Sequence, residues 1–315
     1  MALSMAPRRL ALDRDGIFLL LGVTVMAAAL AIPAFRDPAN LANVVRQAGV
    51  LGILAIGQTF VITAGMIDLS IGMVAGLVVV LSSAMLNGDA ALTLPVAVLM
   101  LLIGAAIGAL NGTLLNTLRL HPLILTFGML SVLQGAIFSF TEKSVGRTSE
   151  PLSMLANGDL LGMPWTAALL LVVAIAGHLV FSRTGFGYHL VAAGGNPESA
   201  RRAGVNIERI RLAVFIISGT SAALAGLLLA GRLGTGYPLA GNGLELDAIV
   251  AVVLGGTLLS GGRGSVWRSL AGVLMLAVIS NVLNLMGIPA FVQMFIKGVI
   301  VIAAILLSQP RGATS

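Results

Sequence analysis

Residues 90–118, AALTLPVAVLMLLIGAAIGALNGTLLNTL, contain no charged side chain. About 20 apolar residues in an α-helix cross a bilayer core about 30 Å thick, so this run predicts a transmembrane helix. The whole chain has the same character, because 58% of its 315 residues are hydrophobic and only 10% are charged. Soluble domains carry about 25% charged residues. The sequence therefore excludes a water-soluble enzyme and predicts an all-α polytopic integral membrane protein.

Uncharged runs recur along the chain and predict about ten transmembrane helices. They are 16–35, 47–67, 69–88, 90–118, 120–141, 160–182, 212–231, 248–262, 269–296 and 289–308, the last broken only by Lys297. The eighth run is short, and whether 65–72 or 248–262 re-enters instead of crossing stays open. The first run follows three arginines, as in a signal peptide. It lacks a convincing cleavage site before Arg36, so a retained helix is predicted.

The basic residues predict the orientation of these helices. Ten spans place both termini on one side. With the N-terminus inside, the cytoplasmic segments hold twelve arginines and the outer segments five basic residues. Because cytoplasmic loops are enriched in Lys and Arg, we expect an N-in, C-in topology. The formal charge of +6 is dispersed between the spans, so no nucleic-acid partner is predicted.

The chain 1–315 is expected to form a single transmembrane domain with two loops longer than a turn. The outer loop is 142–159 and the cytoplasmic loop is 183–211. Five spans in each half are compatible with an inverted 5+5 repeat.

Residue types that build enzyme sites are scarce. Cysteine is absent and histidine occurs three times, so neither a thiol nucleophile nor a dense metal cluster is expected. The only lysines are Lys143 and Lys297, and no phosphate-binding P-loop motif occurs. The sequence predicts no metal site and no resident cofactor. The 39 glycines are typical of closely packed transmembrane helices.

The cytoplasmic loop carries a well-defined short helix. Asn196 is a suitable N-cap, Pro197 suits the first helical position, and Glu198 complements the positive helix end. Gly204 provides a left-handed stop, so a helix from Pro197 to Ala203 is predicted. Asn206 is expected to cap a second helix. Two interpretations stay open: the short helix docks a cytoplasmic partner, or it connects two spans along the membrane surface.

Three segments carry a family resemblance. Residues 187–205, GYHLVAAGGNPESARRAGV, resemble the coupling loop of ATP-binding-cassette importer permeases of the ribose, xylose, arabinose and galactose class. Residues 57–72, GQTFVITAGMIDLSIG, are similar to that family's signature after the second span, and stretches within 243–265 are similar to its C-terminal signature. The segments follow the family's order, and the resemblance covers nearly the whole chain.

The resemblance implies a permease subunit of an importer in a bacterial inner membrane. Such a permease pairs with a second permease, as a homodimer or heterodimer. Two cytoplasmic ATPase subunits bind the ATP, and a periplasmic or extracellular sugar-binding protein delivers a monosaccharide. The permease itself has no ATPase site. The residues implied in coupling to the ATPase are Gly194, Gly195, Asn196, Pro197, Glu198, Ala200, Ala203 and Gly204.

Polar residues inside the apolar runs are candidates for the translocation path or its gate. They are Gln58, Thr63, Asp68, Ser70, Asn111, Glu245, Asp247 and Lys297. For most of them a structural role competes with contact to sugar. Asp68 either caps the third span at the cytoplasmic interface, or faces an aqueous path where Gly65 and Gly72 break the chain. For Asn111 and Asn116, hydrogen bonds between helices are favoured.

The remaining charged candidates are Glu245 and Asp247, which precede the eighth span, and Lys297. Glu245 and Asp247 are two residues apart and do not share a helix face, so charge at a helix N-terminus is favoured over acid–base chemistry. A sugar or gating role near the outer mouth stays open. Lys297 falls near the middle of its run, where a lipid-facing charge costs about 2.5–3.5 kcal/mol. An ion pair with Asp68 or Asp247, or an interface role, is therefore predicted.

Other functions fit parts of the pattern. A related permease could carry branched-chain amino acids, nucleosides or a signalling furanose. An ion-coupled carrier is disfavoured because buried carboxylates are few. A membrane transferase on lipid-linked substrates is disfavoured because no loop carries an Asp-x-x-x-Asp pair.

Overall fold

Helices dominate the computed structural model, which describes residues 16–160, 162–289, 291–296 and 298–299. In chain order the helices are α1 Gly16–Ala31, the 3-10 helix η1 Pro33–Arg36, α2 Pro38–Thr63, α3 Ile71–Leu86, α4 Thr93–Leu118, α5 Pro122–Phe140, α6 Glu150–Asn157, α7 Trp165–Arg183, α8 Gly185–Gly195, α9 Pro197–Arg202, α10 Ile207–Leu233, α11 Leu244–Leu254 and α12 Val266–Leu285. Strands β1 Asp159–Leu160 and β2 Met163–Pro164 form one small antiparallel hairpin between α6 and α7.

Each of the first nine predicted runs contains a helix. By length and composition, six described helices can cross a membrane: α2, α4, α5, α7, α10 and α12. The chain is therefore a multi-pass membrane protein, as predicted. Helices α1 and α3 are apolar but shorter, and α11 has 11 residues, a length of about 16 Å. Most of the tenth run, including Lys297, lies outside the described residues, so the count of ten spans stays a prediction.

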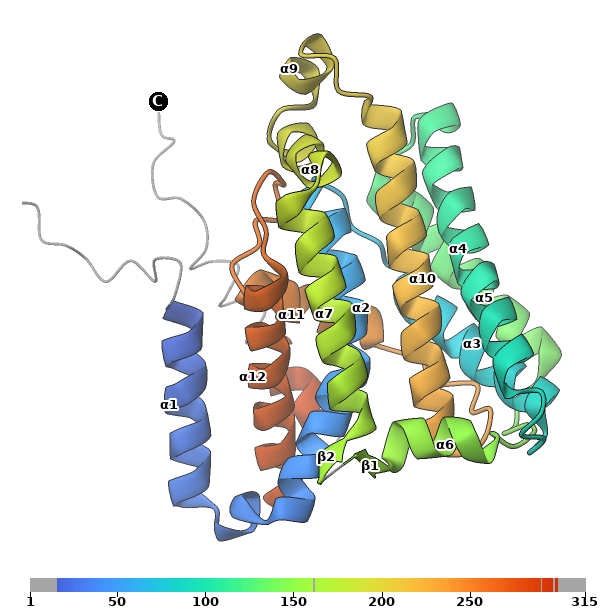
Figure 1. The fold of residues 1–315 in the computed structure, drawn as a ribbon, viewed down its shortest axis with the longest axis vertical. Helices are drawn as coiled ribbons and strands as arrows, with labels where there is room; N and C mark the ends of the chain where they lie inside the picture. Colours follow the sequence, from blue (N-terminus) through green and yellow to red (C-terminus); the bar gives the residue numbers. More distant parts are fainter. Residues whose placement is uncertain (1–15, 161, 290, 297, 300–315) are drawn as a thin grey trace, which may run out of the picture.

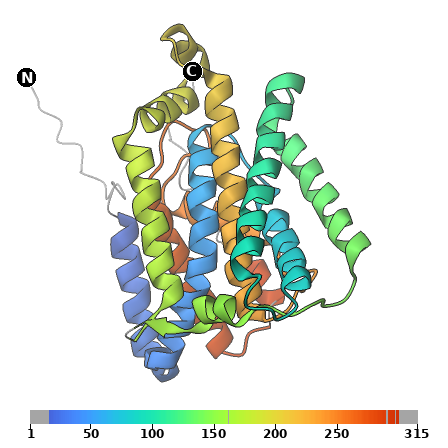
Figure 2. The same cartoon turned by 45° about the vertical axis from the view of Figure 1, so that its right-hand side comes forward.

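The long helices α2 and α10 form the centre of the bundle (Figure 1). Residues 48–63 of α2 are all buried, so this helix is surrounded by protein. Helices α7, α11 and α12 pack on α2, while α3, α4 and α6 pack on α10. Helix α5 contacts α3 and α4 at the periphery (Figure 2). The buried core therefore follows the α2–α10 pair.

Helices α4 and α10 are in close backbone contact. Gly104, Gly108 and Gly112 recur at every fourth position of α4 and so share one face. A β-carbon added at Gly104 would overlap the carbonyl oxygen of Gly219, and one at Gly108 would overlap that of Phe215. Small residues of this kind let helix backbones approach where lipid gives no hydrophobic driving force.

The N-terminal part of α2 differs from the prediction. The uncharged run begins at 47, whereas α2 begins at Pro38, because Asp37 caps it by accepting a hydrogen bond from the amide of Ala39 at 2.9 Å. Arg46 interrupted the run but lies within the helix, where it forms a 2.7 Å ion pair with Asp159. Asp37 and Pro38 are therefore a helix start signal in the sequence. The charge of Arg46 placed the predicted start nine residues too late, because the prediction counted only uncharged runs.

Each half of the chain contains a long helix, an irregular break and a short helix. Residues 64–70 separate α2 from α3, and residues 234–243 separate α10 from α11. The two breaks start from opposite ends of the bundle, and the short helices meet at their N-termini. Gly72 of α3 lies against Glu245 and Gly241, so tightly that a β-carbon at Gly72 would overlap the Glu245 carboxylate.

The two predicted groups of basic residues lie at opposite ends of the bundle. Arg119 and Arg201 line one pocket at the end that carries α8 and α9, and Arg263 lines another there. At the end that carries η1 and α6, Arg46 pairs with Asp159 and Arg232 donates to Asn43 at 3.4 Å. These five arginines therefore lie at the two ends as the sequence-based sorting groups them.

Candidate functional site

Helix α9 projects from one end of the bundle between α8 and α10 (Figure 1). Its Asn196 cap accepts a hydrogen bond from the amide of Ser199 at 2.9 Å. Glu198 and Arg202 form an exposed ion pair at 3.2 Å. Gly204 has a left-handed φ of +86° and ends the helix. The predicted short helix, its cap and its stop are confirmed, with the helix one residue shorter than expected.

The eight residues implied in coupling divide into two groups. Six are exposed on or beside α9: Gly195, Asn196, Pro197, Glu198, Ala203 and Gly204. Gly194 and Ala200 are buried. A β-carbon at Gly194 would overlap the carbonyl oxygen of Thr63, which belongs to α2. These two residues therefore fix the loop to the bundle, and the exposed six form the face that a partner can reach.

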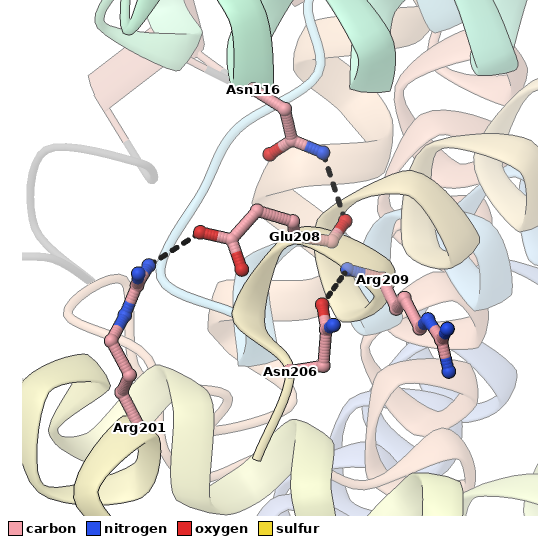
Figure 3. Close-up of polar contacts among 5 residues, drawn as sticks. All are labelled: Asn116, Arg201, Asn206, Glu208 and Arg209. Atoms are coloured by element: carbon pink, nitrogen blue, oxygen red, sulfur yellow. Dashed lines mark hydrogen bonds and ion pairs between the residues drawn. The ribbon is translucent and has the colours of Figure 1, made fainter. Parts of the chain in front are cut away.

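The base of α9 is joined to two other helices through Glu208 (Figure 3). The Glu208 carboxylate pairs with Arg201 of α9, and the Glu208 carbonyl accepts from Nδ2 of Asn116 in α4 at 2.9 Å. Asn206 caps α10 by accepting from the amide of Arg209 at 2.8 Å. The predicted capping by Asn206 and the interhelical bond of Asn116 are confirmed. These contacts connect α9 to the start of α10, and the start of α10 to α4.

The three segments that carry the family resemblance meet at this end of the molecule. The amide of Gly262 donates to the carbonyl of Thr63 at 2.8 Å, which joins the loop after α11 to the end of α2. A β-carbon at Gly261 would lie 2.6 Å from the carbonyl oxygen of Gly194 and 2.7 Å from the backbone of Gly65. Segments far apart in sequence thus form one backbone junction beneath α8 and α9.

A buried polar cluster surrounds Asp68 in the break between α2 and α3. The side chain is 1% exposed. One carboxylate oxygen accepts from the amide of Ser70 at 2.9 Å and from its hydroxyl at 2.6 Å, and the other accepts from the hydroxyl of Ser218 at 2.7 Å. Nδ2 of Asn111 donates to the Ser70 hydroxyl at 3.0 Å. The cluster therefore connects the start of α3 to α4 and α10.

The position of Asp68 corrects one expectation. Ser218 is eleven residues after the first residue of α10, which places Asp68 about 16 Å along that helix. Asp68 does not cap α3, whose N-cap is Ser70 and carries no side-chain capping bond; its carboxylate forms a turn with the Ser70 amide. It lies inside the bundle, not at the end that carries α8 and α9. The chain does break between Gly65 and Gly72, as the aqueous-path interpretation expected. Such a break is tolerated within a membrane protein where surrounding protein supplies partners for its backbone groups.

The remaining path candidates lie apart from this cluster. Gln58 is fully buried, and no partner for its side-chain nitrogen or oxygen is found within the described residues. The Thr63 hydroxyl donates to the carbonyl of Thr59 at 2.7 Å. Glu245 and Asp247 lie inside the first turn of α11 instead of before it. Glu245 is 9% exposed and meets α3, whereas Asp247 lines a cavity at the end of the bundle that carries η1 and α6, here named the outer cavity. Lys297 lies outside the described residues.

The outer cavity has a volume of about 430 Å³ and opens between α2, α10, α11 and α12. Its polar lining is Asn43, Gln47, Arg232, Asp247 and Asn284. Amides and carboxylates arranged in this way can donate to and accept from the hydroxyl groups of a small polar ligand. The volume lies within the usual range for small-molecule sites.

Several of these residues were missed in the sequence. Ser218 is an ordinary serine in an apolar run, and nothing local links it to Asp68. Asn43 precedes the predicted second span and Gln47 begins it, and neither was among the candidates. Asn40 and Asn281 form a reciprocal amide pair at 3.0 and 2.7 Å between α2 and α12. In α2 the signal was the spacing of Asn40, Asn43 and Gln47, which places these polar residues on one helix face.

Within the described ranges, no group of three or more His, Asp or Glu side chains is placed to hold a metal ion. The described polar groups are arranged for hydrogen bonding and for contact between helices.

Comparison with known proteins identifies the family. The model of the family described as branched-chain amino acid transport system / permease component matches residues 40–305. The ribose import permease protein RbsC of Bacillus subtilis (strain 168) is 35% identical over 310 residues, covering 96% of this chain and 94% of the relative. The L-arabinose permease protein AraH of Azospirillum brasilense is 31% identical, covering 95% and 88%.

A third relative, the xylose transport system permease protein XylH of Escherichia coli (strain K12), is 31% identical, covering 86% of this chain and 85% of the relative. No solved structure matches the chain significantly. Similarity at this level over nearly the whole length is decisive for membership. The chain belongs to the family of ABC transporter membrane permeases that includes the ribose, arabinose and xylose permeases.

Proposed function

We propose that this chain is the transmembrane pore subunit of an ABC importer that moves a monosaccharide, a ribose-like pentose or a hexose, into the cytoplasm. The relatives that cover nearly all of the chain are sugar permeases. The observation that carries the proposal is α9, an exposed, capped helix joined to α10 and α4 through Glu208. ATP is bound by separate cytoplasmic ATPase subunits, and the chain has no ATPase site or cofactor of its own.

The proposed orientation is N-in and C-in, with ten spans in a bacterial inner membrane. The arginine-rich end with α8 and α9 then faces the cytoplasm, in agreement with the positive-inside rule. The end with η1 and α6 faces outward and receives the sugar-binding protein. A second permease, identical or closely related, completes the pore. The repeated order of long helix, break and short helix supports an inverted repeat.

The coupling mechanism follows from the contacts of α9. When the ATPase subunits close on ATP, they displace α9. The Arg201–Glu208 pair passes this displacement to α10, and the Asn116 bond passes it to α4. The close α4–α10 contact makes these two helices move together. Deeper in the bundle, the Asp68 cluster connects the same two helices to α3. The pore therefore switches by movement of packed helices.

The outer cavity is the proposed entry to the sugar path. Half of its ten lining residues are polar and can bond sugar hydroxyls, although the family's description names branched-chain amino acids. Binding there need only be weak, because a binding protein selects the sugar. Family membership leaves the ion-coupled carrier and the membrane transferase without support.

Removing the α9 cap tests the coupling role. Asn196→Ala is expected to lower sugar-stimulated ATP hydrolysis at least fivefold in the assembled transporter. Loss of an N-cap costs about 1 kcal/mol, and a six-residue helix has little stability of its own. The matched control is Asp37→Ala, which removes an equivalent cap from the 26-residue α2 at the opposite end of the bundle. Equal stimulated rates in the two variants would argue against docking through α9.

Removing one amide from the outer cavity tests the sugar path. Gln47→Leu is expected to lower sugar uptake into proteoliposomes about tenfold, because a sugar hydroxyl left without a partner costs about 1–3 kcal/mol. Asn242→Leu serves as the control, since Asn242 is an exposed amide outside that cavity. Basal ATP hydrolysis should not change in either variant. Unaltered uptake by Gln47→Leu would exclude the cavity from the path.

A further inference from the structure

A second cavity lies beside α9, at the opposite end of the bundle from the outer cavity. Its volume is about 460 Å³, which is sufficient for a small-molecule ligand. It is enclosed by the end of α4, the start of α5, α9 and the start of α10. Three arginines line it: Arg119, Arg201 and Arg211. The transport path described above does not use it.

The charges of this cavity are unbalanced. Against three arginines stands one carboxylate, Glu208, which pairs with Arg201. Among the described residues, no hydrogen bond or ion pair is found for the guanidinium groups of Arg119 and Arg211, although Arg211 also interacts electrostatically with Glu208. The lining therefore carries a net charge of about +2 at neutral pH, since arginine stays protonated. Two unpaired guanidinium groups facing one cavity favour an anion that accepts bidentate hydrogen bonds.

Two further features distinguish this cavity from a general basic surface. Oδ1 of Asn116 is buried in its wall, without a partner in the described structure, while Nδ2 of the same residue is engaged by Glu208. A hydroxyl group beside the anion could donate to this oxygen. Arg119 ends α4 in the left-handed conformation, with φ of 52°. Glycine or asparagine would adopt that conformation at lower energy.

We propose that this cavity is a phosphate-binding site, open to the cytoplasm in the orientation described above. A phosphate dianion matches the net charge of the lining, and its oxygens match the guanidinium groups. The group can belong to a phosphorylated small molecule, such as a sugar phosphate whose hydroxyl reaches Asn116. It can also belong to the headgroup of an anionic lipid.

Occupation of this site would act on the coupling contacts. A phosphate held by Arg119 and Arg211 joins α4 to α10 beside the Arg201–Glu208 pair. It would therefore reinforce the α4–α10 contact at the point where the proposed coupling reaches these helices. Binding itself does not depend on the proposed sugar transport and is measured without ATPase or binding protein, so the two proposals can fail separately.

The test is calorimetric titration of the purified full-length chain, in phosphatidylcholine nanodiscs, with inorganic phosphate and with ribose 5-phosphate. We expect saturable binding that is weakened at least tenfold by Arg119→Gln and by Arg211→Gln. Arg183→Gln is the matched control, because Arg183 is an exposed arginine at the same end of the bundle but outside the cavity. That control should bind as the unaltered chain does.

A second arm separates the two sources of phosphate. In phosphatidylglycerol nanodiscs, native mass spectrometry reports lipid retained by the chain. The site holds a lipid phosphate if two results are obtained in these nanodiscs. The unaltered chain retains lipid that Arg119→Gln does not retain, and the unaltered chain no longer binds ribose 5-phosphate. The proposal is overturned if no phosphate probe distinguishes Arg119→Gln from Arg183→Gln. It is also overturned if Arg119→Gln weakens only capture of the ATPase.

Discussion

Gly108→Ala is expected to destabilise this permease by about 3 kcal/mol, the upper part of the usual range for overpacking. The added β-carbon would overlap the carbonyl oxygen and carbon of Phe215 in α10. A backbone carbonyl cannot move aside as a flexible side chain can. The helices α4 and α10 must therefore separate along the close contact through which the proposed coupling passes. Thermal unfolding of the purified chain should show a clear loss of stability, and ATP-driven uptake should fall with it.

The control for this change is Gly128→Ala in α5. Both glycines lie within helices, and a β-carbon at Gly128 meets no atom within 4 Å. Glycine in a helix interior costs about 1 kcal/mol relative to alanine. Gly128→Ala should therefore be neutral or slightly stabilising. If Gly108→Ala unfolded at the same temperature as this control, the close approach of α4 and α10 would be wrong.

Asp68→Ala is expected to cost about 4 kcal/mol and to abolish transport. The substitution leaves the Ser70 amide, the Ser70 hydroxyl and the Ser218 hydroxyl without an acceptor inside the bundle. Each unsatisfied buried polar group costs about 1–3 kcal/mol. The start of α3 loses its connection to α10, so chemical unfolding of the purified chain should begin at a lower denaturant concentration.

Asp89→Ala is the matched control, because Asp89 makes the same type of turn contact on the surface. Its carboxylate accepts from the amide of Ala91 at 2.8 Å and is exposed. That loss should be about 1 kcal/mol or less. Asp68→Asn, which keeps one acceptor oxygen, should recover part of the stability. Equal destabilisation by Asp68→Ala and Asp89→Ala would contradict the buried cluster.

The elements that the sequence predicted well are those fixed by local chemistry. The apolar runs located nine helices, because a helix that crosses lipid must be long and uncharged. The α9 helix was correct in its cap, its first residue and its stop, since Asn196, Pro197 and Gly204 act within one or two turns. The sorting of arginines at two ends followed from the same positional rule.

The elements that it predicted poorly depend on contacts between distant segments. A single charge, Arg46, shortened the predicted α2, although Asp159 neutralises that charge in the folded chain. The depth of Asp68 depends on Ser218, 150 residues away in sequence. The second break, at 234–243, lies between Arg232 and Glu245 and was left outside the predicted runs, but its contact with Gly72 depends on packing alone.

ATP hydrolysis by the reconstituted transporter tests the central claim most directly. The chain is co-purified with its ATPase and placed in nanodiscs. Hydrolysis is then measured with the binding protein empty or loaded with ribose, arabinose, xylose or galactose. The account predicts several-fold stimulation by one loaded form, lost when residues 196–203 are scrambled in a chain that still folds. Absence of co-purification, together with no stimulation by any loaded form, would contradict it.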